Sequence, residues 1–152
     1  SAKLVSGNRF TAPYRSDFTV LKKTAKFSLR HYSHAQKSTE HSRSHVLLIP
    51  PLMVTAEIYD MAPDLSATVY LREQGHDVWG IDFGTPEATQ GGLEKTLADH
   101  VLAVSEAIDE MVARRAAPVH LVGYSQGGMF AYQAAALRRC RDIASVITMG
   151  DC

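Results

Sequence analysis

The chain has 152 residues, of which 45% are apolar and 21% are charged, as is usual for a soluble globular domain with its own core. Sixteen basic residues balance sixteen acidic ones, so net charge gives no reason to expect binding to nucleic acid or to an anionic membrane. Two cysteines cannot form a disulfide framework, and no apolar run approaches the roughly 20 residues of a membrane span. We therefore expect a reducing, cytoplasmic location. Because the chain begins with serine, we expect a processed product or a piece of a longer protein.

The N-terminal region predicts an arm followed by a pair of strands. Residues 1–17 are polar and mixed, which predicts an irregular arm. Apolar and polar residues alternate along 18–22 and 26–32, the period of a half-buried strand. We expect these two stretches to pair antiparallel at one edge of a sheet and a polar loop to follow over 34–44.

Strands and helices alternate along the rest of the chain. Apolar runs predict buried strands at 45–49, 77–82, 119–122 and 143–149. Residue spacing and composition predict helices between them, at 58–74, 93–115 and 129–137. Pro63 lies inside the first of these, so that helix could instead start near Asp64 or Ser66. The alternation predicts an α/β fold: a mostly parallel sheet with helices on both faces.

The stretch from Val119 to Met129 carries the strongest functional signal. An apolar strand runs into Gly123-Tyr124-Ser125-Gln126-Gly127, and a helix rich in small residues follows. A G-x-S-x-G match between a strand and a helix predicts a nucleophile elbow, whose tight turn strains the serine backbone. Glycines two residues to either side remove the clash that side chains would cause there. We predict that Ser125 is a nucleophile; the alternative is a glycine-rich turn with an incidental serine.

Blocks of sequence from about Phe18 to the end of the chain resemble a known family. Pro50-Pro51-Leu52, Glu73-Gln74-Gly75-His76 and the elbow stand in the order seen in polyhydroxyalkanoate synthases and their serine lipase-like relatives, which are α/β-hydrolases. The resemblance implies that 18–152 is the N-terminal half of such a domain, truncated after the strand that follows the nucleophile helix. It also implies a hydrophobic acyl ester or acyl-CoA as substrate, no metal or other cofactor, and an association with lipid or polymer storage bodies.

Two departures from the family pattern bear on activity. The polymerising synthases carry a cysteine at the elbow, and this chain has Ser125, which favours a depolymerase, lipase or acyltransferase relative. The family also places its acid and histidine after the nucleophile, yet no histidine follows Ser125 here. We therefore expect the chain to be inactive alone and to need a C-terminal half of the same protein or a partner chain. Self-association into a homo-oligomer is a further expectation, because the last strand would be an exposed apolar edge.

Position in the predicted fold suggests the other site residues. An oxyanion needs two N–H donors, and Gln126 supplies one at the start of the helix after the serine. The second donor is expected in the loop after 45–49, where the two prolines have no N–H, so Leu52 is the candidate. Asp151 is the candidate acid, against the alternative of a polar residue that opens a loop. Asp82 and Asp99 are expected to be structural.

All seven histidines precede Ser125, and we expect none of them to be its base. His100 falls within a helix, and the others lie at strand starts or in the N-terminal region: His31, His34, His41, His45, His76 and His120. Catalysis in such sheets takes place at the carboxyl ends of the strands. A metal cluster built from the first four of these six has no recognised ligand spacing, which favours solvated loop histidines. The competing function is a non-catalytic interaction or structural module that keeps the elbow without base and acid.

Overall fold

The computed structural model of the protein describes residues 16–32, 44–52, 54–84 and 95–150. Its centre is a six-stranded sheet in the order β1-β2-β4-β3-β5-β6. The strands are β1 (Phe18–Lys23), β2 (Ser28–Tyr32), β3 (His45–Ile49), β4 (Asp77–Asp82), β5 (Val119–Tyr124) and β6 (Ile143–Met149). Strands β4, β3, β5 and β6 are parallel, and β1 and β2 extend the sheet antiparallel at one edge. The predicted strands and the mostly parallel α/β architecture are confirmed.

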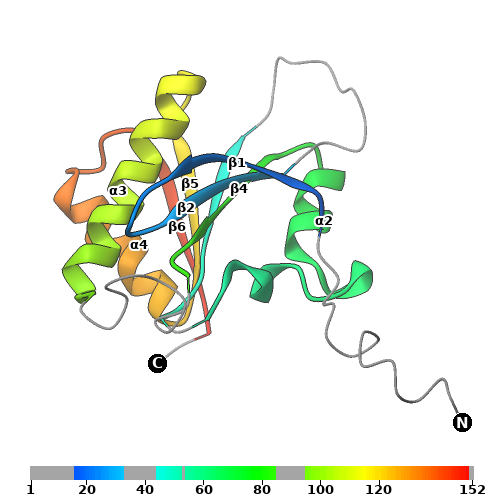
Figure 1. Ribbon diagram of the computed structural model, residues 1–152. Helices are drawn as coiled ribbons and strands as arrows, with labels where there is room; N and C mark the ends of the chain where they lie inside the picture. Colours follow the sequence, from blue (N-terminus) through cyan, green and yellow to red (C-terminus); the bar gives the residue numbers. More distant parts are fainter. Residues whose placement is uncertain (1–15, 33–43, 53, 85–94, 151–152) are drawn as a thin grey trace, which may run out of the picture.

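Helices cover both faces of the sheet (Figure 1). The long helices α3 (Leu97–Arg114) and α4 (Gln126–Leu137) lie on one face, and α2 (Ala67–Glu73) lies on the other. Because side chains alternate along a strand, each central strand feeds both layers. In β3, Leu47 and Ile49 pack under α3 and α4, whereas Val46 and Leu48 pack under α2. No helix within the described ranges combines the length and apolar character needed to cross a bilayer.

The helix predicted over 58–74 is wrong in its first half. Two short 3-10 turns, η2 (Ala56–Tyr59) and η3 (Pro63–Leu65), precede α2 instead. Pro63 opens η3, because its missing N–H is tolerated only at the first positions of a helix. Ser66 is extended, and its side chain accepts from the Val69 N–H at 3.0 Å, which caps α2. The alternative start near Ser66 is therefore the correct one.

The other two helices differ from prediction at their first residues. α3 begins at Leu97, because Thr96 and Asp99 exchange side-chain and backbone hydrogen bonds in a capping box. The predicted start at Leu93 lies outside the described residues. α4 begins at Gln126, directly after Ser125, and not at Met129 as predicted. This earlier start places the first turn of α4 beside the serine.

A buried carboxylate lies at the amino ends of the parallel strands β3 and β4. Asp77, at the start of β4, accepts from His31 Nε2 at 2.7 Å and from Trp79 Nε1 at 3.1 Å. The fully buried His45 places its Nε2 3.2 Å from the same carboxyl group. Burial acts to raise the pKa of Asp77, but the contacts with His31, His45 and Trp79 outweigh it and hold that pKa well below its usual range.

This cluster corrects one sequence-based interpretation. His31 lies in β2 and His45 in β3, both against Asp77, so neither is a solvated loop histidine. His34 and His41 lie outside the described residues. Among the described residues, no group of three or more histidine, cysteine or acidic side chains could hold a metal ion.

β6 is the last strand of the described sheet, and apolar side chains surround it. Large apolar residues are exposed on β6, on α4 and at the end of β5: Tyr124, Met129, Tyr132, Leu137, Ile147 and Met149. An edge strand also presents backbone N–H and C=O groups that can pair with another strand. The surface around β6 is therefore apolar and has an open strand edge, as is typical of surfaces that pack against another protein segment.

Replacing Asp77 with asparagine is expected to lower the free energy of unfolding at neutral pH by about 3 kcal/mol, because buried donors lose an ionised acceptor. Since the pKa of Asp77 is lowered on folding, its contribution is present above the ordinary value of 3.8 and is lost as the pH falls below it. The difference between wild type and Asp77→Asn should thus shrink as the pH falls from about 5 toward about 3. Urea denaturation at several pH values measures it.

Asp109→Asn is the matched control. The Asp109 side chain is 60% exposed, and its partner Arg138 also binds Asp142, so we expect a loss below about 1 kcal/mol. If Asp77→Asn costs no more than this control, the cluster is not a source of stability.

Candidate active site

Ser125 occupies a strained turn at the carboxyl end of β5. Its φ is 54° and its ψ is −121°, in a region that non-glycine residues rarely adopt. Such a conformation costs on the order of 1–3 kcal/mol and persists only where neighbouring structure fixes it. Here the Ser125 N–H donates to the Met149 carbonyl at 2.8 Å, and the Ser125 carbonyl accepts from the Gly128 N–H at 2.9 Å. The turn has the backbone that the sequence predicted; the chemical role of Ser125 stays a prediction.

Close backbone contacts explain the glycines of the turn. A Cβ atom on Gly123 would collide with the backbone of Gly127 and Gly128, and a Cβ on Gly127 would collide with the Ile49 carbonyl oxygen. A Cβ on Gly128 would lie 2.8 Å from Thr148 Cγ2. The first turn of α4 therefore packs against the ends of β3 and β6 at distances that exclude side chains.

The two residues predicted to supply oxyanion donors are in contact. The Leu52 N–H donates to Gln126 Oε1 at 3.2 Å, which links the loop after β3 to the start of α4. Gln126 is the first residue of α4, and the first N–H groups of a helix have no acceptor within it. The helix dipole also favours negative charge at this end. The geometry brings both residues to the elbow, and their role as oxyanion donors stays a prediction.

Tyr59 is the site residue that sequence reasoning missed. Its buried hydroxyl donates to the Ile49 carbonyl at 2.5 Å and accepts from the Tyr124 N–H at 2.9 Å. Burial raises the pKa of Tyr59, so the hydroxyl keeps its proton and its donor role. Tyr59 lies in the Ile58-Tyr59-Asp60 block of the family resemblance, but nothing in the sequence gave it a role, since its hydroxyl contacts backbone 65 residues away, just before Ser125.

Four of the described histidines have side-chain contacts away from the elbow. His31 and His45 contact Asp77, and His120 Nδ1 lies 2.6 Å from Ser145 Oγ. His100 Nδ1–H donates to the Thr96 carbonyl at 2.8 Å, and its ring stacks on Phe130. These contacts agree with the expectation that none of these histidines is the base of Ser125.

Of the aspartates considered as the catalytic acid, Asp82 has structural contacts and Asp151 lies outside the described residues. Asp82 accepts from the buried Arg30 at 2.9 Å and from the Gly84 N–H at 3.2 Å, and Arg30 also pairs with Glu57 at 2.8 Å. Burial acts to lower the pKa of Arg30, but Glu57 and Asp82 together raise it. Asp82 thus organises the loop after β4, as expected.

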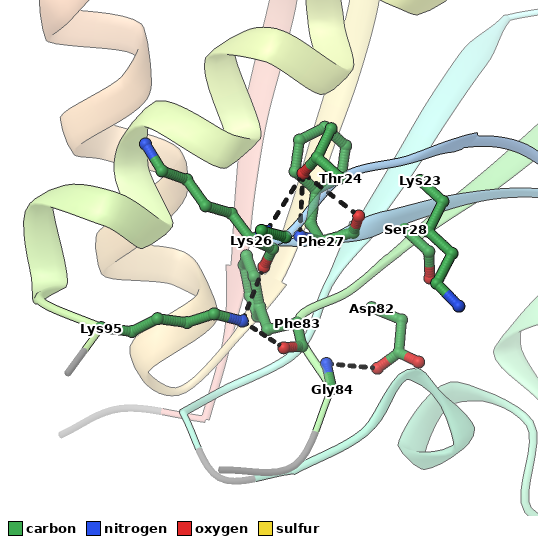
Figure 2. A pocket seen from close by; sticks show the side chains of 10 residues that line it. Lys23, Thr24, Lys26, Phe27, Ser28, Asp82, Phe83, Gly84 and Lys95 are labelled. Atoms are coloured by element: carbon green, nitrogen blue, oxygen red, sulfur yellow. Dashed lines mark hydrogen bonds between the residues drawn. The ribbon is translucent and has the colours of Figure 1, made fainter. Parts of the chain in front are cut away.

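A cavity of about 380 Å³ lies at the carboxyl end of β4 (Figure 2). Residues 23–28, 82–84 and Lys95 line it. The Lys95 ammonium donates to the Phe83 carbonyl at 2.7 Å and to the Lys26 carbonyl at 2.8 Å, and burial lowers the pKa of Lys95. This lysine therefore ties the β1–β2 turn to the end of β4.

Comparison with known proteins gives the geometry a context. Residues 46–151 match the model of the alpha/beta hydrolase family. The chain is 32% identical over 120 residues to the poly(3-hydroxyalkanoate) polymerase subunit PhaC of Haloferax mediterranei, which covers 78% of this chain and 24% of that protein. The resemblance noted from the sequence is confirmed.

Solved structures share the fold. The mature lipase BlEst2 of Bacillus licheniformis matches with a TM-score of 0.62 at 16% identity, over 86% of this chain and 48% of the lipase. A carboxyl esterase of Bacillus coagulans matches with a TM-score of 0.63 at 15% identity, over 91% of this chain and 44% of the esterase. The chain thus spans less than half the length of either enzyme.

Replacing Gly127 with alanine tests the contact between α4 and β3. In an ordinary helix this change adds up to about 1 kcal/mol of stability. Here the new methyl group would meet the Ile49 carbonyl, so we expect the free energy of unfolding to fall by about 2 to 3 kcal/mol. Chemical denaturation measures the change.

Gly75→Ala is the control, because Gly75 has a φ of 87° but nothing within 4 Å of a new Cβ. It should cost about 1 to 2 kcal/mol through backbone strain alone and leave the elbow intact. A Gly127→Ala variant more stable than wild type would show that α4 does not pack this closely on β3.

Proposed function

This chain belongs to the alpha/beta hydrolase family, and we propose that its Ser125 is the nucleophile of an acyl transfer or of ester or thioester hydrolysis. The observation that carries the proposal is the strained backbone of Ser125, at the junction of β5 and α4. Strained residues cluster at active sites, where the surrounding structure supports them. The close contacts of Gly123 and Gly127 provide that support here.

The proposed reaction proceeds through an acyl-enzyme. Ser125 Oγ attacks the carbonyl carbon while a base takes its proton, and the alcohol or thiol of the substrate leaves with a proton. The N–H groups of Gln126 and Leu52 hold the oxyanion that forms in between. For this, the Leu52 N–H exchanges Gln126 Oε1 for the substrate oxygen. Water or an alcohol then takes the acyl group from Ser125.

We propose that the base and the acid belong to a further part of the hydrolase domain that packs against β6. That part is either the C-terminal half of the same protein or a partner chain. Two observations support this: the contacts of His31, His45, His100 and His120 away from the elbow, and the exposed apolar side chains on β6 and α4. Asp151, two residues beyond β6, is a candidate for the acid.

The proposed substrate is a hydrophobic acyl ester or an acyl-CoA, handled in the cytoplasm near lipid or polymer storage bodies. Its support is the similarity to a protein named as a poly(3-hydroxyalkanoate) polymerase subunit. A serine nucleophile favours release of the acyl group to water or an alcohol over polymerisation. The same histidine contacts also favour the competing function, a non-catalytic module that keeps the elbow, and the following experiment decides between them.

A fluorophosphonate probe should label Ser125 in the full-length protein, because an activated serine attacks phosphorus as it attacks a carbonyl. Ser125→Ala should abolish labelling, as read by intact-protein mass spectrometry. Ser125→Cys should still form an acyl-enzyme but release it to water more slowly. Ser145→Ala, on β6, is the control and should label like wild type; labelling that persists in Ser125→Ala would remove Ser125 as the nucleophile.

Residues 1–152 alone should self-associate and show negligible esterase activity. The exposed edge strand β6 can pair with a strand of another chain. Loss of a catalytic base lowers the rate by orders of magnitude. Size-exclusion chromatography with light scattering reports the assembly, and ester turnover reports the activity, each compared with the full-length protein. A soluble monomer with Ser125-dependent turnover would contradict both parts of this expectation.

A further inference from the structure

The Tyr59 hydroxyl takes the place of a backbone hydrogen bond between β3 and β5. These two parallel strands are in register from His45 with Val119 to Ile49 with Gly123. The next bond of a parallel ladder would run from the Tyr124 N–H to the Ile49 carbonyl. Instead, the Tyr59 hydroxyl donates to that carbonyl at 2.5 Å and accepts from that N–H at 2.9 Å. The two strands are thus joined through a side chain at their carboxyl ends.

The two backbone groups that Tyr59 joins lead directly into the proposed site. Ile49 is followed by the two prolines and Leu52, the loop that carries the second oxyanion donor. Tyr124 is followed by Ser125. The loop and the elbow therefore have two links: the Tyr59 hydroxyl at their bases, and the Leu52 N–H to Gln126 Oε1 bond further out.

Tyr59 is itself held firmly. Its side chain is 4% exposed and packs with Val46, Leu48 and Val122 under α2. The next residue, Asp60, accepts hydrogen bonds from the hydroxyls of Ser16 and Ser66, which fix the chain on that side. The hydroxyl therefore has little freedom to move relative to the sheet.

We propose that Tyr59 is a positioning residue that sets the spacing between Ser125 and the oxyanion loop through its hydroxyl. This inference rests on the proposed function, since it assigns the loop and the elbow to one acyl-transfer site. Oxyanion stabilisation depends on donors fixed in advance at the position where charge develops. A misplacement of about 1 Å in such a site costs up to about 100-fold in rate.

Tyr59→Phe removes the hydroxyl and keeps the ring. The ring still fills the space between the strand ends, so the Tyr124 N–H and the Ile49 carbonyl cannot close into a direct bond. Both groups then lose their partner, and the spacing of loop and elbow is no longer fixed. Tyr32→Phe is the matched control, because Tyr32 is a buried tyrosine of the same cluster whose hydroxyl faces Arg30.

The experiment uses the full-length protein and a fluorophosphonate probe over a range of probe concentrations. We expect Tyr59→Phe to lower the maximal labelling rate by at least about tenfold, with an unchanged concentration for half-maximal rate. Tyr32→Phe should label at the wild-type rate. Equal labelling rates in the two variants would overturn the proposal.

Backbone hydrogen exchange at Tyr124 gives a readout that does not need activity. Exchange should be faster in Tyr59→Phe, where the N–H loses its acceptor, and unchanged in Tyr32→Phe. If wild type is not labelled at all, the proposed function fails, and exchange still tests the hydroxyl bridge. If wild type is labelled but exchange at Tyr124 is the same in both variants, the Tyr59 inference alone fails.

Discussion

The contact between the first turn of α4 and the Ile49 carbonyl, at the carboxyl end of β3, is the constraint on which the elbow depends. Gly127 approaches the Ile49 carbonyl so closely that no side chain fits between them. Because α4 starts there, Ser125 must turn sharply and takes a positive φ. The same Ile49 carbonyl accepts from the Tyr59 hydroxyl, so one carbonyl group contacts both the helix and the tyrosine that links β3 to β5.

Polar groups divide between the two edges of the sheet according to their task. At the amino ends of β3 and β4, the carboxylate of Asp77 contacts His31, His45 and Trp79. At the carboxyl ends lie the strained Ser125 and the groups that hold it. This division agrees with the general rule for parallel sheets, in which ligands bind in the loops at the carboxyl ends of the strands.

Sequence patterns predicted the strands and their mostly parallel arrangement, because buried parallel strands are continuous apolar runs. The elbow was also readable, since only glycine fits where Gly123 and Gly127 lie. Helix starts were less predictable. Ser66 and Thr96 cap the starts of α2 and α3 with hydrogen bonds from their side chains. The spacing of apolar residues does not reveal such bonds.

The sequence by itself determined the alternation of strands and helices and the position of the strained serine, because both depend on neighbouring residues and local sterics. Only the tertiary structure decided which residues distant in sequence contact the backbone around that serine. Tyr59 reaches Tyr124 across the ends of two strands, and Asp77 contacts both His31 and the fully buried His45. Such contacts have no period in the sequence, because they arise from the packing of segments whose separation along the chain is unrelated to their distance in space.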